Sequence, residues 1–216
     1  MSDSASRLRQ LLDELFRHDP VRATDAGDHR FDDRWPDRSP AGRAALLAFL
    51  DRWLVELEAA DLDGLDPDDA LDIRVARAEL EAIRHAETEL RSDAWNALAW
   101  VELAGAGLFL LLAREFAPLA DRLASVAGRL EALPDLLGAA RDELRGTAGR
   151  PPSRLHVEAA VDQLPGVVAL VDEALAAAET AVRGGDDAVA ALLPRLRAAA
   201  DVGRPDRREV DVGRGA

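Results

Sequence analysis

The sequence predicts an all-α protein, a bundle-like domain of about seven to eight helices with no sheet. Hydrophobic residues make up 48% of the 216 positions, and most of them are Leu and Ala, which are strong helix formers. Apolar residues recur at helical spacing along most of the chain, and no segment shows the sustained alternation that is typical of strands. A chain of this length and composition is able to bury a sizeable core.

The first expected helix carries an apolar stripe that begins at Leu8 and ends at Leu15. Asp19-Pro20 is expected to end it, because the residue before a proline avoids the helical region. We expect a polar connection from there to about Pro36. The pairs Ser39-Pro40 and Asp66-Pro67 each predict a new helix, since a capping side chain is followed by proline in the first turn.

The second half of the chain is also helical by pattern. An apolar helix is expected at Ala94–Ala113, a further stripe runs from Leu119 to Leu130, and Pro134 is expected to begin a shorter helix. Gly146–Ser153 is the clearest linker.

A long helix follows this linker, and we expect it to be kinked or split at Pro165-Gly166 and to stop at Gly184-Gly185. The last helix is expected at Asp186–Ala200. We therefore divide the chain into a helical domain, residues 1–200, and a tail, residues 201–216, that is disordered or an aberrant end, because it has no apolar face to bury.

The segment Ala94–Ala113 is long enough to span a membrane, and Glu102 is its only charged residue. A glutamate in the middle of a span costs about 2–3 kcal/mol. We therefore expect a buried central helix and no membrane partner. A membrane-associated helical protein is the weaker alternative.

The net charge of −14 makes nucleic acid an unexpected partner, because an acidic surface repels phosphates. All 27 basic residues are Arg, and the chain has no Cys, which excludes disulfides and thiolate chemistry. No signal peptide is visible at the start of the sequence. We expect a cytoplasmic protein.

The polar segment Ala23–Trp35 holds the residues with the most chemistry. His29 with Asp28, Asp32 and Asp33 has the residue types of a metal site or an acid–base pair. The alternative is that these groups cap helix ends and satisfy backbone donors, with Arg34 and Arg30 as ion-pair partners. We favour this structural role.

A catalytic zinc site in a helical hydrolase usually needs two His four residues apart with an adjacent Glu as base. The four His of this chain are His18, His29, His85 and His156, and no two are four apart. No Ser or Thr has a His at a recognisable spacing for a triad. We therefore expect neither a catalytic residue nor a bound metal in this chain.

Three segments, in order, resemble a large bacterial family catalogued as domain of unknown function 885. The first, His18–Pro40, has the spacing of the family's opening signature. The second is Gly107–Arg141, with an Arg-acid-Phe-Ala-Pro run and two Arg-Leu steps, and the third is Pro151–Gly166. The resemblance covers roughly Leu8–Ala200, and the signature residues of the first segment are Pro20, Thr24, Gly27, His29, Asp32 or Asp33, Asp37 and Ser39.

This resemblance implies a mostly helical, zinc metallopeptidase-like protein more than twice as long as this chain. The family's zinc motif lies in its second half, which nothing here matches. The chain would then be the N-terminal part alone, inactive by itself, with zinc expected only in complete members. In such a protein His29, Asp32, Asp33 and Arg34 would line or brace a cleft, and exposed apolar faces would favour homo-oligomers.

The alternative hypothesis is a complete, non-enzymatic helical interaction protein, whose apolar stripes are all used internally or in a stable homodimer. The sequence names no substrate.

Overall fold

The computed structural model describes residues 3–147 and 151–202, so almost all of the expected tail lies outside the described residues. The described residues form eight α-helices and no strand, which confirms the all-α prediction. Four short turns of other helix types complete the chain: η1 (His29–Phe31) and η3 (Ser92–Ala94) are 3-10 turns, and η2 (Ala86–Leu90) and η4 (Glu143–Thr147) are π turns. The α-helices are α1 (Asp3–His18), α2 (Pro20–Ala26), α3 (Pro40–Glu58), α4 (Pro67–His85), α5 (Ala97–Ala113), α6 (Leu119–Asp142), α7 (Arg154–Arg183) and α8 (Asp187–Val202).

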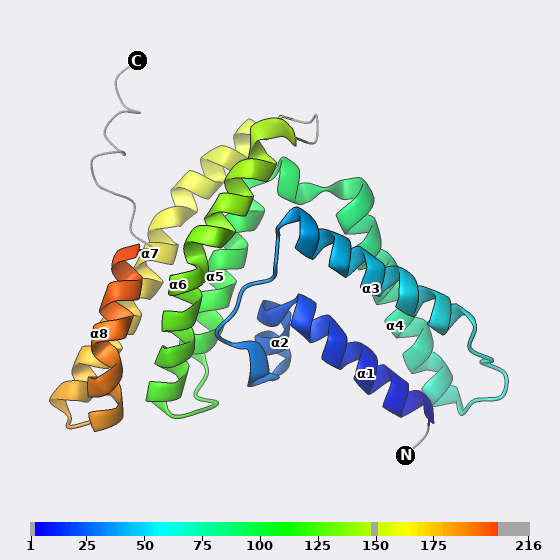
Figure 1. Cartoon of the computed structure of the whole chain (residues 1–216), viewed down its shortest axis with the longest axis horizontal. Helices are drawn as coiled ribbons and strands as arrows, with labels where there is room; N and C mark the ends of the chain where they lie inside the picture. The colour runs from blue at the N-terminus through cyan, green and yellow to red at the C-terminus, as the bar shows by residue number, and fades with distance from the viewer. Residues whose placement is uncertain (1–2, 148–150, 203–216) are drawn as a thin grey trace.

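The helices form two groups, with α2 and the extended segment after it lying between them (Figure 1). Helices α1, α3 and α4 pack around one core, in which Trp53 and Leu50 are almost fully buried. Helices α5 to α8 pack around a second core, centred on Leu111, Leu123 and Leu130. The polar segment is therefore in contact with the bundle of α5 to α8 while it connects α1 to α3.

The expected helix starts at Ser39-Pro40 and Asp66-Pro67 are confirmed. The Ser39 hydroxyl accepts a hydrogen bond from the Gly42 backbone N–H at 3.1 Å, and the Asp66 carboxylate accepts one from Asp68 N–H at 3.0 Å. In both helices proline occupies the first turn, where its missing N–H costs nothing.

The connection expected up to Pro36 is not irregular throughout, because it begins with α2. Asp19 ends α1 as predicted, but its carboxylate also caps α2 by accepting a hydrogen bond from Arg22 N–H at 3.1 Å. Gly27 ends this helix with φ +87°, a backbone conformation that glycine adopts without steric cost. The same residue pair thus stops one helix and starts the next.

The helix start expected at Pro134 is wrong, and so is the alternative in which the long helix is split at Pro165-Gly166. Pro134 lies inside α6 and Pro165 lies inside α7, and both helices continue past them. Each proline is exposed, so its ring lies on the solvent side of its helix. Packing of the apolar face on both sides of each proline outweighs a helix cost of about 3 kcal/mol.

Helix α5 begins at Ala97, three residues later than expected, because Asn96 caps it by accepting from Leu98 N–H at 3.0 Å. Its Trp100, Leu108 and Leu111 are buried in the second core. Among the described helices, none is by itself long and apolar enough to cross a membrane. By length and composition alone, the bent pair Pro67–Ala94 and Ala97–Ala113 passes as a broken span, with a 106° angle between its parts.

The polar segment approaches the bundle so closely that glycine is required in α5. A Cβ added to Gly107 would lie 2.2 Å from the Trp35 ring. The indole N–H of Trp35 also donates to the Arg129 carbonyl at 2.7 Å, so the ring is held in this position. Gly107 therefore sets the distance between the polar segment and the bundle.

We predict that Gly107→Ala lowers the free energy of unfolding by about 1–3 kcal/mol, because the added methyl overpacks the contact with Trp35. Urea unfolding followed by tryptophan fluorescence measures this. Gly138→Ala in α6 is the control, since its added Cβ meets no atom within 4 Å. It is expected to be neutral or to stabilise by up to about 1 kcal/mol, and equal destabilisation by both variants would contradict the prediction.

A second prediction concerns pH. Burial of the His18 ring beside Phe49, with ring centroids 5.0 Å apart, lowers the pKa of His18 below its ordinary value of 6.5, although the charge of Glu14 opposes this. The unfolded chain then binds a proton that the folded chain does not, so stability falls as the pH falls through 6.5. We expect His18→Gln to reduce this slope in urea titrations between neutral and mildly acidic pH. A slope identical to that of the parent chain would refute the prediction.

Candidate functional site

A fully buried arginine organises the polar segment. Arg129 of α6 donates from Nε to the Arg34 carbonyl at 3.1 Å and from Nη2 to Thr24 Oγ1 at 2.8 Å. Its Nη1 donates to the Gly107 carbonyl. The guanidinium therefore joins α2, the segment after η1 and α5.

Burial lowers the pKa of Arg129 to about 10, and the charges of Asp32, Asp33 and Asp19 partly oppose this. The side chain thus stays charged at neutral pH. Its guanidinium carbon lies 5.4 Å from the centroid of the Trp35 ring, a cation–π geometry. A buried charge is tolerated only when its donors are satisfied, so these contacts are a structural requirement.

Asp32 continues this buried polar chain, and the exposed His29 contacts it from the surface. Asp32 is buried, and its carboxylate accepts from Thr24 Oγ1 at 2.6 Å and from His29 Nδ1 at 2.9 Å. The His29 ring stacks on Phe116, with ring centroids 3.6 Å apart and planes 4° apart. The carboxylate and the aromatic ring together fix the orientation of the imidazole.

Asp33 and Arg34 point elsewhere. Their side chains are 57% and 66% exposed, form a 3.4 Å ion pair and lie at the rim of a cleft. Of the four residues singled out from the sequence, only Asp32 is buried, and only Asp33 and Arg34 line this cleft. The capping role considered above is seen at Asp28, whose carboxylate accepts from Arg30 N–H, and the Arg30 side chain lowers the pKa of Asp28.

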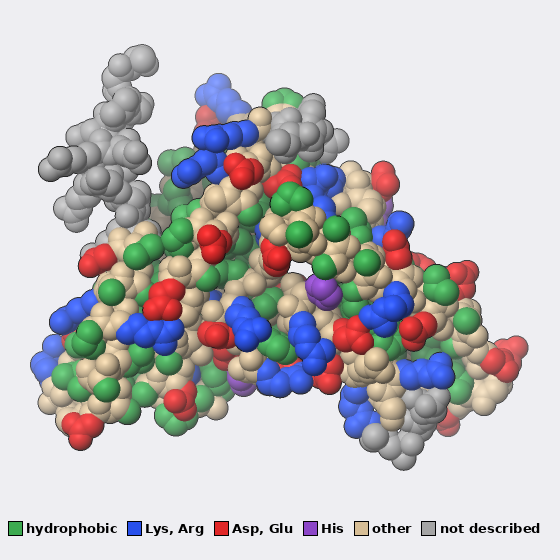
Figure 2. All heavy atoms as spheres, in the orientation of Figure 1, with side chains coloured by type: hydrophobic (Ala, Val, Ile, Leu, Met, Phe, Trp, Pro, Cys, Tyr) green, Lys and Arg blue, Asp and Glu red, His purple; other side chains and the backbone are tan. Residues whose placement is uncertain are grey.

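The cleft lies between the polar segment and α6 and has a volume of about 1120 Å³. Between the two helix groups the face in Figure 2 is hollowed, with acidic and basic side chains interleaved around it. Residues that line the cleft include Asp33, Arg34, Trp35, Arg43, Asp142 and Glu143.

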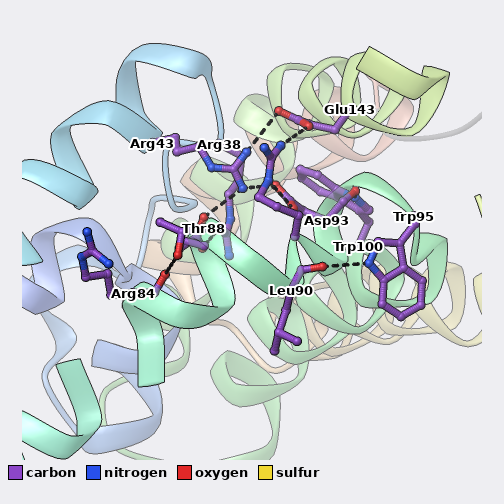
Figure 3. Close-up of polar contacts among 11 residues, drawn as sticks. Arg38, Arg43, Arg84, Thr88, Leu90, Asp93, Trp95, Trp100 and Glu143 are labelled. Carbon is purple, nitrogen blue, oxygen red and sulfur yellow. Dashed lines mark hydrogen bonds and ion pairs between the residues drawn. The ribbon is translucent and has the colours of Figure 1, made fainter. Parts of the chain in front are cut away.

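A network of three arginines and three carboxylates closes one end of the cleft (Figure 3). Arg43 of α3 contacts Glu87 at 3.1 Å, Asp93 at 2.6 Å and Glu143 at 3.5 Å. Arg38 pairs with Glu87 at 2.7 Å, and Arg91 pairs with Glu143 at 2.7 Å and with Asp93 at 3.3 Å. The network joins α3, η2, η3 and η4, so it ties the two helix groups together.

Two features of this network are unusual. Arg91 has φ +44° and ψ +46°, and it is the one non-glycine residue with positive φ in the described chain. Its N–H bonds the Ala86 carbonyl at 2.9 Å, so the left-handed conformation ends the η2 turn. Arg43 Nε is buried and has no hydrogen-bond partner among the described residues.

Within residues 3–147 and 151–202, no group of three or more His, Cys, Asp or Glu side chains is arranged to hold a metal ion. The chemistry of the cleft is that of paired charges and an indole. Such a surface is able to hydrogen-bond a polar ligand, and its lining residues Asp33, Arg34 and Asp135 are exposed to solvent.

Sequence reasoning gave no role to Arg129 or to Arg122. Both belong to the Arg-Leu steps, and their spacing of seven residues puts them on the same face as the buried Val126 and Leu130. Their position on the apolar face of the helix is the sequence signal that could have identified both arginines as buried. Arg122 donates to the Leu111, Leu112 and Ala117 carbonyls and so satisfies the C-terminal end of α5.

We predict that Asp32→Asn and Asp33→Asn have different effects, although the residues are adjacent. Loss of the buried charge at Asp32, which faces His29 and Arg129, should lower the free energy of unfolding by about 1–3 kcal/mol. The exposed Asp33 should contribute within about 0.5 kcal/mol. Paired urea titrations test this, and equal effects would show that the buried chain is not a structural requirement.

Comparisons with known proteins found one family and one solved structure that match this chain. The family model described as "Bacterial protein of unknown function (DUF885)" matches residues 20–210. A solved structure, titled as that of a "putative lipoprotein of unknown function from Shewanella oneidensis", matches with a TM-score of 0.73 and 23% identity, over 100% of this chain and 40% of that one. This likeness shows a shared fold, and the chain spans well under half of that protein's length. No curated protein matches. The chain belongs to the DUF885 family of bacterial proteins of unknown function.

Proposed function

We propose that this chain is the helical, non-catalytic part of a larger zinc peptidase-like protein, and that it supplies one wall of the substrate cleft. In this proposal the metal and the general base belong to the rest of the longer fold. The chain's own contribution is to position Asp33, Arg34 and Trp35 along the cleft.

The peptidase class comes from the resemblance of the three segments described above. The division of labour is supported by the sequence, in which no two His are spaced to hold zinc from one helix, and by the match to 40% of a longer fold. The observation that carries the proposal is the cleft of about 1120 Å³ beside the polar segment. Clefts of this size with a few convergent polar groups are the usual form of a binding site.

The chemistry of the cleft rim suits an extended peptide. Asp33 and Arg34 offer an acceptor and a donor side by side, and Trp35 offers an apolar surface next to them. Arg129 and Gly107 hold Trp35 rigidly, so the rim needs little ordering when a ligand binds. We propose His29 and Asp32 as residues that brace this rim from inside.

The alternative proposal is a non-enzymatic helical interaction protein. The observation that favours it is that each helix group already has a buried core of its own. Under this alternative the purified chain is a well-protected monomer or homodimer in hydrogen exchange and light scattering.

We predict that the purified chain binds no stoichiometric zinc and hydrolyses no peptide. Elemental analysis after dialysis against zinc, together with a fluorogenic peptide library, measures both properties. His29→Ala serves as a check, because His29 is the strongest single candidate ligand. One tightly bound zinc per chain that is lost in His29→Ala would overturn the proposal.

A further inference from the structure

Helix α8 covers only part of α7. At 1.5 Å per residue, the 30 residues of α7 extend about 45 Å and the 16 residues of α8 about 24 Å. After a short turn at Gly184-Gly185, α8 returns along α7 and packs between α6 and α7 (Figure 1). The first half of α7 therefore extends beyond the end of α8.

One apolar face runs along both halves of α7. Val161, Val168, Leu175 and Val182 follow one another at intervals of seven residues, so they lie on one side. Leu175 and Val182 are partly buried against the second core. Glu179, on the same side, binds Arg197 of α8 at 2.8 Å, which shows that α8 covers this side of the second half.

The first half of this face is uncovered by any described helix. Val157, Val161, Leu164 and Val168 are 38%, 59%, 47% and 37% exposed. Their spacing of four, three and four residues is that of a helix-packing seam. We name these four residues the α7 stripe. Four aligned apolar side chains on a surface are typical of an interaction site.

We infer that the α7 stripe is the docking site of an amphipathic helix from the part of the longer family fold outside this chain. The inference rests on the proposed function, in which the chain is one part of a longer protein. The stripe continues the α7–α8 interface without a break in register, and the matched structure extends well beyond the 40% that corresponds to this chain. A following helix of that fold would extend the layer that α8 begins.

Two other occupants fit less well. Residues 201–216 contain eight charged residues, no Leu, and valines only at 202, 210 and 212, which do not share a helical face at this spacing. A second copy of the chain would bring its own Asp162, which flanks the stripe, near the Asp162 of the first copy. Each copy also has a net charge of −14, so the two copies repel each other.

The occupant's chemistry follows from α8, which already packs on this face. The buried residues Val189, Leu193, Leu196 and Ala200 of α8 have the same spacing of four, three and four, and arginines flank them. We therefore expect an apolar stripe at this spacing, with basic residues beside it to meet Asp162, since Glu158 already pairs with Arg154 at 2.7 Å.

The test uses a labelled synthetic helical peptide with leucines at this spacing and flanking arginines, titrated into the full 216-residue chain by fluorescence anisotropy. A peptide of the same composition with its order scrambled is the peptide control. We expect saturable binding of the patterned peptide alone. The double variant Val161→Asp, Leu164→Asp should weaken it at least about tenfold, because each side chain contributes more than 1 kcal/mol when buried.

Val75→Asp is the matched protein control, since Val75 is 59% exposed on α4, in the other helix group. The inference is overturned if the patterned peptide does not bind, or if it binds the double variant as tightly as the parent chain. Sedimentation of a concentration series is the second measurement. A dimer of the parent chain that the double variant abolishes would assign the stripe to a second copy and overturn the inference. Neither the binding titration nor the sedimentation measurement depends on zinc or hydrolysis. A negative result for the α7 stripe is therefore distinguishable from a failure of the proposed function.

Discussion

The burial of one guanidinium group constrains the rest of the structure. Arg129 has no access to solvent, and each of its donors needs an acceptor inside the protein. Thr24, Arg34 and Gly107 supply those acceptors from segments that are far apart in sequence. The path of the polar segment across the bundle is therefore determined by the hydrogen-bonding geometry of a side chain on α6, because any other path would leave a buried charge without partners.

Because of this constraint, neighbouring residues of the polar segment lie in different environments. Asp32 faces inward, and its hydrogen bonds to Thr24 and to the more exposed His29 extend the chain that begins at Arg129. Asp33 and Arg34 follow directly, but they face the cleft, because the close contact with α6 turns the backbone outward there. A Cβ added to Gly128 would lie 2.9 Å from the Cβ of Asp33, so the α6 backbone is in direct contact at this turn. His29 and Asp32, whose residue types suggest an acid–base pair, are therefore hydrogen-bonded to each other beside the buried Thr24 and Arg129.

Local sequence signals predicted most of the helices, whereas the features that depend on long-range contacts could not be predicted from them. Ser39 and Asp66 act as caps because a cap depends only on the next three residues. Asp19 obeys the same rule, so α2 was predictable. Pro134 was misjudged because packing across α6 outweighs a local preference. The acceptors of Arg129 lie 22 to 105 residues away, and no local pattern specifies which carbonyl or hydroxyl a buried side chain reaches.

The ion-pair network determines the width of the cleft. Arg43 comes from the first helix group and Glu143 from the end of α6, so their contact fixes the angle between the groups. Three arginines and three carboxylates pair with one another in the network, whereas Asp33, Arg34 and Asp135 of the cleft lining are exposed to solvent. The left-handed backbone of Arg91 costs about 1–2 kcal/mol, and it persists because its side chain completes the network. Since both helix groups keep separate cores, a change in this network alters the cleft before it alters either core.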